Sequence, residues 1–211
     1  METWWLIFTV AGVYLLAAIS PGPNFVVVIN NALAHSRKTG LYTAAGVACG
    51  STLHTLMGFV GISALVVQSV WLFQLVKVGG GVYLIVLGLQ TLWSSRRAIE
   101  LPAVDISQIC APGELTSGRA LRTGFITCAV NPKAAVFFLS LFSLMIEPTT
   151  PLWAKVTMII MIALLSFSWY SSVACLFSND RARVIYLRSK RKINGLFGCL
   201  LIALGIKVSL T

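Results

Sequence analysis

The sequence predicts an all-α membrane protein with six transmembrane helices, arranged as two inverted repeats of three helices. Hydrophobic residues make up 57% of the 211 residues and charged residues only 10%, compared with about 25% charged residues in an average soluble domain. Six apolar stretches are long enough to cross a bilayer, for which about 20 residues suffice. Two of these stretches carry proline near their middle, which predicts that helices 1 and 4 are broken near the membrane midplane.

The expected spans follow one another along the chain, and no stretch between them is long enough to fold as a soluble domain. They cover residues 4–31, 40–67, 71–93, 119–146, 152–177 and 194–210. We therefore expect a single transmembrane domain over residues 1–211. Its repeat halves are about 1–95 and 118–211, joined by a cytoplasmic linker at about 94–118.

The first span contains the segment AISPGPNFVVV, in which Pro21, Gly22 and Pro23 interrupt an apolar helix. A break at membrane depth frees backbone N–H and C=O groups, and these are tolerated only inside protein or beside a water-filled cavity. The segment after the break begins near Asn24 as a half-helix, meaning one part of a broken span. Its free N–H groups and positive dipole end would point at that cavity. The alternative is a kink that only shapes packing.

The second span places Gly46, Gly50, His54 and Gly58 four residues apart, so they share one side of the helix. Small residues on a face allow another helix to approach closely. We therefore expect His54 to face the bundle interior. Because an imidazole titrates near neutral pH, His54 is the candidate for proton coupling. The alternative is a neutral histidine bonded to a backbone carbonyl.

The third and sixth spans end in similar segments, GVYLIVLG at 81–88 and GCLLIALG at 198–205, which agree at five of eight positions. Three spans per half is an odd number, so the two halves would have opposite orientations in the membrane. Pro21 in span 1 and Pro132 in span 4 are a second correspondence. Broken helices at matching positions of inverted halves indicate the binding site of a transporter.

The fourth span is broken in the segment VNPKAAVFF, where Asn131, Pro132 and Lys133 follow one another. A lysine near the membrane midplane costs about 2.5–3.5 kcal/mol unless water or a partner relieves it. Two half-helix starts and this lysine suit a carboxylate ligand. The alternative for Lys133 is snorkelling toward an interface. We expect Asn24, Asn131 and Lys133 to surround the carboxylate with the flanking backbone amides. The predicted substrate-binding residues also include Pro21, Gly22, Pro23 and Pro132.

The fifth span carries SFSWYSS at 166–172, with serines around Trp169 and Tyr170. The ammonium of an amino acid can be held by hydroxyls, by backbone carbonyls or over an aromatic face. We therefore include Trp169 and Tyr170 among the predicted substrate-binding residues. The alternative is an aromatic belt at the membrane interface.

The basic residues predict the orientation of the chain. Twelve of the sixteen lysines and arginines lie in the loops between spans 1 and 2, 3 and 4, and 5 and 6, whereas only Lys155 and Lys207 lie on the opposite side. By the positive-inside rule, those three loops face the cytoplasm and both termini face the periplasm. The net charge of +10 therefore reflects topology, and a nucleic-acid partner is not expected.

Several functional classes lack their signatures. The five cysteines form neither a CxxC motif nor a metal-ligand spacing, so no metal or other cofactor is expected. No GxSxG, no HExxH and no pair of carboxylates supports catalysis. We therefore expect a transporter and not an enzyme. An intramembrane hydrolase and a non-transporting membrane subunit remain the alternatives, and a homodimer remains open.

The segments SPGPNF at 20–25, VACG at 47–50, VGGGVYLIVLG at 78–88, NPKA at 131–134 and NGLFGCLLIALGIK at 194–207 occur in this order. With them the chain resembles the lysine exporter family, in particular its threonine and homoserine efflux branch, over nearly its whole length. The resemblance implies a bacterial inner-membrane exporter of small neutral amino acids that works as a proton-driven antiporter. Some members of the family carry an acidic residue where this chain has Asn24.

Overall fold

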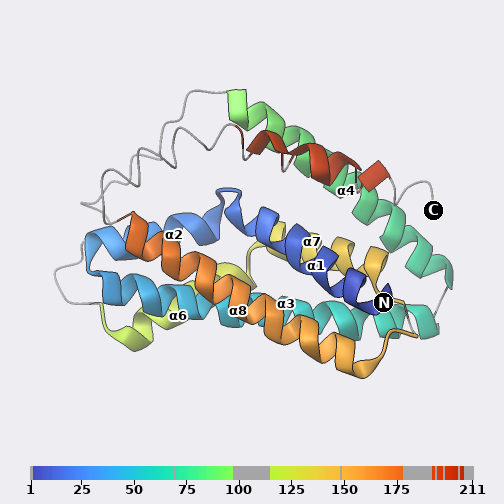
Figure 1. Ribbon diagram of the computed structural model, residues 1–211, viewed down its shortest axis with the longest axis horizontal. Helices are drawn as coiled ribbons and strands as arrows, with labels where there is room; N and C mark the ends of the chain where they lie inside the picture. The colour runs from blue at the N-terminus through green and yellow to red at the C-terminus, as the bar shows by residue number, and fades with distance from the viewer. Residues whose placement is uncertain are drawn as a thin grey trace.

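The computed structural model describes residues 2–68, 70–96, 115–147 and 149–177, together with 192, 194–196, 198–203 and 205–206. The described residues form seven principal helices, and a helical stretch, Asn194–Ala203, follows them (Figure 1). The helices are α1 (Glu2–Ile19), α2 (Pro23–Ala34), α3 (Arg37–Gln68), α4 (Val70–Arg96), α6 (Ser117–Ala129), α7 (Pro132–Met145) and α8 (Leu152–Leu176). Most of the expected linker and of the basic loop after α8 lies outside the described residues.

Both predicted helix breaks are confirmed. The axes of α1 and α2 meet at 57°, and those of α6 and α7 also meet at 57°. The two breaks lie near the middle of the long axis of the molecule (Figure 1). Pro23 and Pro132 each occupy the start of the second half-helix, where a missing N–H costs nothing. Pro132 therefore corresponds in helix position to Pro23. The sequence alone pairs Pro132 with Pro21 instead.

Two described helices are long and apolar enough to cross a membrane alone, Arg37–Gly61 within α3 and Leu152–Leu176. The two bent pairs raise this number to as many as four. The segments Val78–Trp93 and Asn194–Ala203 are apolar but shorter. The described residues are therefore helical without strands, with helices apolar enough for a membrane, and the arrangement of six spans in two repeats stays a prediction.

The glycine face of α3 lies against α6 and α7. A methyl group on Gly46 would collide with the α6 backbone, and one on Gly50 would lie 2.5 Å from the Cβ of Cys128. A methyl group on Gly58 would lie 2.5 Å from the ring of Phe142. The close approach expected from the spacing of these glycines is thus confirmed.

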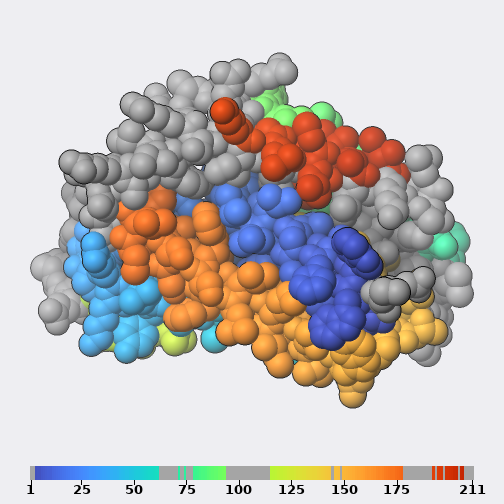
Figure 2. Space-filling model, viewed as in Figure 1, coloured from blue at the N-terminus to red at the C-terminus, as the bar shows by residue number. Residues whose placement is uncertain are grey.

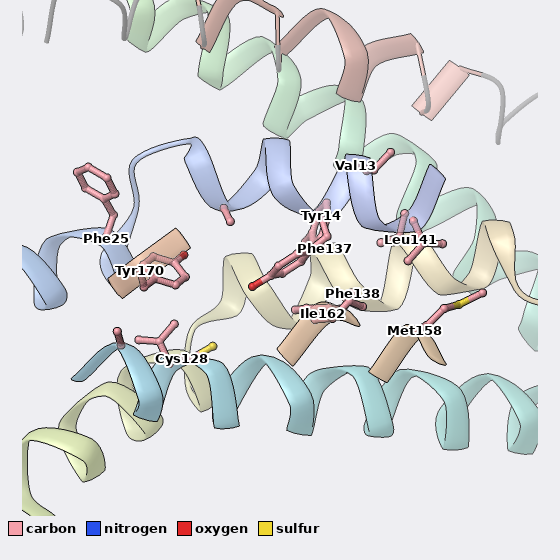
Figure 3. Close-up of a cluster of buried hydrophobic side chains, with 14 of the residues drawn as sticks. Val13, Tyr14, Phe25, Cys128, Phe137, Phe138, Leu141, Met158, Ile162 and Tyr170 are labelled. Carbon is pink, nitrogen blue, oxygen red and sulfur yellow. The ribbon is translucent and has the colours of Figure 1, made fainter. Parts of the chain in front are cut away.

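The core lies between α1, α3, α7 and α8, and aromatic rings of α7 fill much of it (Figure 3). The rings of Tyr14 and Phe138 have centroids 5.6 Å apart. On the face shown in Figure 2, α8 (orange) lies against α1 and α2 (blue). The buried residues of α8 follow a spacing of four, which brings Ser166 and Tyr170 to its inner side.

Candidate functional site

The two helix breaks meet in the interior. The side-chain amide of Asn131 donates a hydrogen bond to the Oδ1 atom of Asn24 at 3.1 Å, and both residues are buried. The Oδ1 atom of Asn131 also accepts from the backbone N–H of Lys133 at 3.0 Å, which caps α7. At the start of α2, Gly22 is the N-cap residue and offers no side chain for capping. The first turn of α2 therefore has no side-chain cap from its N-cap residue.

The side chain of Lys133, from the start of α7, lies next to the break between α1 and α2. Its Nζ atom is 3.5 Å from the hydroxyl oxygen of Ser20, to which it donates. A methyl group built on Gly22 would be 3.6 Å from the same Nζ atom. Within the described part of the chain, no acidic side chain pairs with Lys133. Because an ammonium has three donors, Lys133 has capacity for an anionic partner.

A small cavity of about 50 Å³ opens between the breaks. Its polar side is formed by Ser20, Gly22, Asn24, Asn131 and Lys133, and its apolar side includes Ala17, Leu87, Phe137 and Phe138. This volume has room for a few water molecules.

Hydroxyl and thiol groups extend this polar region toward α3. Tyr14 donates to Ser51 Oγ at 3.2 Å, and Ser166 donates to the same oxygen at 3.3 Å. Ser51 Oγ lies 3.7 Å from the sulfur of Cys128, which also accepts from Asn24 at 3.3 Å. The sequence prediction missed Tyr14, Ser51 and Cys128 as site residues. Ser51 directly follows Gly50 of the glycine face of α3, and this position in the sequence could have indicated that Ser51 lies in the interior.

His54 faces the bundle interior, as its spacing from the glycines predicts. It is buried, its Nε2 atom donates to the carbonyl of Cys128 at 2.9 Å, and its ring stacks on Phe138. This carbonyl lies in the last turn of α6 and also accepts from the backbone N–H of Asn131 at 3.1 Å. The contact is the bond to a backbone carbonyl that the alternative reading of His54 describes. His54 does not line the cavity, and its role in proton coupling stays a prediction.

The two aromatic residues of the fifth span have different positions. Tyr170 is buried and lines the cavity, which favours an interior role over an interfacial belt. Trp169 is half-buried, and its indole N–H donates to the carbonyl of Ala18 at 2.9 Å. Trp169 thereby holds the last turn of α1 next to the break, outside the cavity lining.

The three prolines of the predicted site also lie outside the cavity lining. Pro23 and Pro132 are exposed and start their half-helices, while Pro21 lies in the non-helical turn between α1 and α2. They therefore shape the breaks and do not face the cavity. No group of three metal-ligating side chains occurs in the described ranges.

Comparison with known proteins places the chain in a family. The model of the LysE type translocators matches residues 15–211. The threonine efflux protein of Escherichia coli K12 is 33% identical over 204 residues, covering 95% of this chain and 96% of that protein. The leucine efflux protein of Enterobacter sp. strain 638 is 27% identical over 206 residues, covering 95% and 92%.

The homoserine/homoserine lactone efflux protein of Salmonella typhimurium is 28% identical over 152 residues, covering 72% of this chain and 69% of that protein. No solved structure is significantly similar to the chain. The family match covers nearly the whole sequence and agrees with the resemblance carried by the two proline motifs. The chain belongs to the LysE type translocators, a family of membrane transporters and not of enzymes.

Proposed function

We propose that this protein exports small neutral amino acids, threonine or homoserine first, across the bacterial inner membrane. The observation that carries the proposal is the junction of the two helix breaks, where Asn131 bonds to Asn24 at 3.1 Å and Lys133 lines the same cavity. The names of its relatives, which are threonine, leucine and homoserine efflux proteins, support amino-acid efflux.

The polar side of the cavity suits the carboxylate of an amino acid. Lys133 supplies an ammonium, and hydrogen bonds to ionised groups are the stronger ones. The starts of α2 and α7 add positive dipole ends. Asn24 and Asn131 hold the two starts together. We therefore assign the carboxylate to this side and the ammonium to the region of Tyr170.

Contacts between α4 and the C-terminal helix support the inverted repeat. A methyl group on Gly88 would lie 2.7 Å from the carbonyl oxygen of Gly198, and one on Gly205 would lie 2.6 Å from that of Gly81. Superposing residues 81–88 on 198–205 exchanges these two contacts, as a two-fold axis requires. Together with the equal bends, this favours six spans in inverted halves. The basic loops favour both termini in the periplasm and the linker in the cytoplasm.

Proton-driven antiport is part of the proposal, with His54 as the coupling residue. An antiporter must bind proton and substrate in a competing way. His54 lies outside the cavity lining that forms the carboxylate side, and its ring stacks on Phe138 of the apolar side. A proton on His54 would add positive charge beside the cavity, where it repels the substrate ammonium.

A counterflow screen of the twenty amino acids in proteoliposomes tests the function. We expect uptake of a few small neutral amino acids, and weaker apparent affinity for them in Lys133→Met. Lys155→Met is the matched control, since Lys155 lies in the first turn of α8, away from the cavity. A folded protein that exchanges no amino acid would contradict the proposal and favour a non-transporting subunit.

A hydrolase is the less favoured alternative. It would require a serine nucleophile activated by His54, whereas the Nε2 atom of His54 bonds to a backbone carbonyl. The chain is not expected to bind nucleic acid, and the oligomeric state, with a homodimer as one arrangement, is open to measurement by light scattering.

A further inference from the structure

Three hydroxyl groups from three different helices meet beside the cavity. They belong to Tyr14 of α1, Ser51 of α3 and Ser166 of α8, and all three residues are buried. Tyr14 and Ser51 line the cavity directly. In Figure 3 the side chain of Tyr14 points from α1 toward α7 and α3. The breaks alone do not require such a cluster, because none of the three residues lies within a break.

In this cluster, the hydroxyl hydrogen of Ser51 has only a weak acceptor. A serine oxygen can accept two hydrogen bonds and donate one. Tyr14 and Ser166 both donate to Ser51 Oγ, at 3.2 and 3.3 Å. The hydroxyl hydrogen of Ser51 is therefore left to donate, and its recorded partner is the sulfur of Cys128 at 3.7 Å. Thiol sulfur is a weak acceptor, so an oxygen in the cavity would be a better partner.

The residues around the cavity indicate which oxygen of a substrate could accept the hydrogen bond from Ser51. Lys133 and the two asparagines form the carboxylate side, and the cavity wall next to Tyr14 includes Phe137 and Phe138. We propose that Ser51, held by Tyr14 and Ser166, binds the side-chain hydroxyl of the substrate and selects hydroxyl-bearing amino acids over apolar ones of the same shape. This inference rests on the proposed function and adds the residues that determine specificity.

A comparison of threonine with valine distinguishes a pocket that binds a hydroxyl from a pocket that is only apolar. They have nearly the same shape, and an apolar pocket separates such a pair poorly, whereas a site built to bond a hydroxyl rejects the analogue that lacks it. A single net hydrogen bond corresponds to a preference of about two- to tenfold. We therefore expect threonine to inhibit at a concentration about fivefold below that of valine.

The experiment measures the inhibition of L-threonine counterflow by unlabelled L-threonine and L-valine in proteoliposomes. In Ser51→Ala and Tyr14→Phe, the ratio of the two half-inhibitory concentrations should fall from about fivefold toward about one. Ser143→Ala and Tyr83→Phe are the matched controls, because neither residue lines the cavity, and they should keep the ratio. The ratio does not depend on how much carrier is active, so partial misfolding of a variant does not obscure it.

Equal inhibition by the two amino acids in the unaltered protein would overturn the inference and leave amino-acid export intact. An unchanged ratio in both Ser51→Ala and Tyr14→Phe would also overturn it. Absence of counterflow with every amino acid in the unaltered protein is a different result, because it would refute the proposed function and this inference with it.

Discussion

Replacement of Asn131 by alanine tests the junction of the two breaks. Asn131 makes two contacts through one side chain. Its Oδ1 atom accepts from the N–H of Lys133 at 3.0 Å, and its amide donates to Asn24 at 3.1 Å. The Asn131→Ala variant loses both contacts and leaves the buried Oδ1 atom of Asn24 without this donor.

The expected loss of stability follows from these two contacts. Replacing an N-cap asparagine by alanine costs about 1 kcal/mol. Leaving a buried acceptor unsatisfied costs a further ~2 kcal/mol. The combined cost of about 3 kcal/mol should lower the melting temperature by about 6–12 °C, since each kcal/mol shifts it by about 2–4 °C in a chain of this size.

The assay is thermal unfolding in detergent, followed by circular dichroism, with Asn31→Ala as the matched control. Asn31 is a buried asparagine whose amide donates to Thr43 at 2.8 Å, so its loss removes a hydrogen bond but no helix cap. We expect Asn31→Ala to cost less than Asn131→Ala. In a double-mutant cycle, Asn131→Ala should cost about 1–2 kcal/mol less in the Asn24→Ala background. Additive effects of Asn24→Ala and Asn131→Ala would refute the coupling of the two breaks.

Three further predictions concern coupling, packing and topology. His54→Gln should lose pH-driven export but keep exchange between equal pools, and unaltered pH-driven accumulation in His54→Gln vesicles would remove His54 from the mechanism. Gly46→Ala should lower the melting temperature because its methyl group collides with the α6 backbone, whereas Gly12→Ala, with open space around it, should not; equal melting temperatures would contradict this packing. A cysteine introduced at position 107 or 186 should react with an impermeant reagent only from the cytoplasmic side, and labelling from outside intact cells would invert the proposed orientation.

The helix breaks could be predicted from sequence because their cause is local. Proline lacks the backbone donor and clashes with the preceding turn wherever the chain places it. The glycine face of α3 was predictable for a similar reason, because a spacing of four residues keeps Gly46, Gly50 and Gly58 on one side. Both features need only the helical period and the identity of the residue.

The junction of the breaks is different, because it depends on contacts between distant parts of the chain. Asn24 and Asn131 are 107 positions apart, and no local pattern shows that their side chains bond. The hydroxyl cluster was missed for the same reason, since Tyr14, Ser51 and Ser166 come from three helices. Single serines and tyrosines in apolar spans become informative only once the packing of α1, α3 and α8 is known.

Binding of the substrate carboxylate at the junction is tested most directly by comparing L-threonine with L-threonine amide, which lacks the negative charge. Inhibition of counterflow by the two compounds should differ by about tenfold or more in the unaltered protein, because hydrogen bonds to a charged group contribute about 1.5–3 kcal/mol. In Lys133→Met this preference should fall toward one, while Lys155→Met should keep it. A Lys133→Met protein that prefers the free carboxylate as strongly as the unaltered protein would contradict the proposed site.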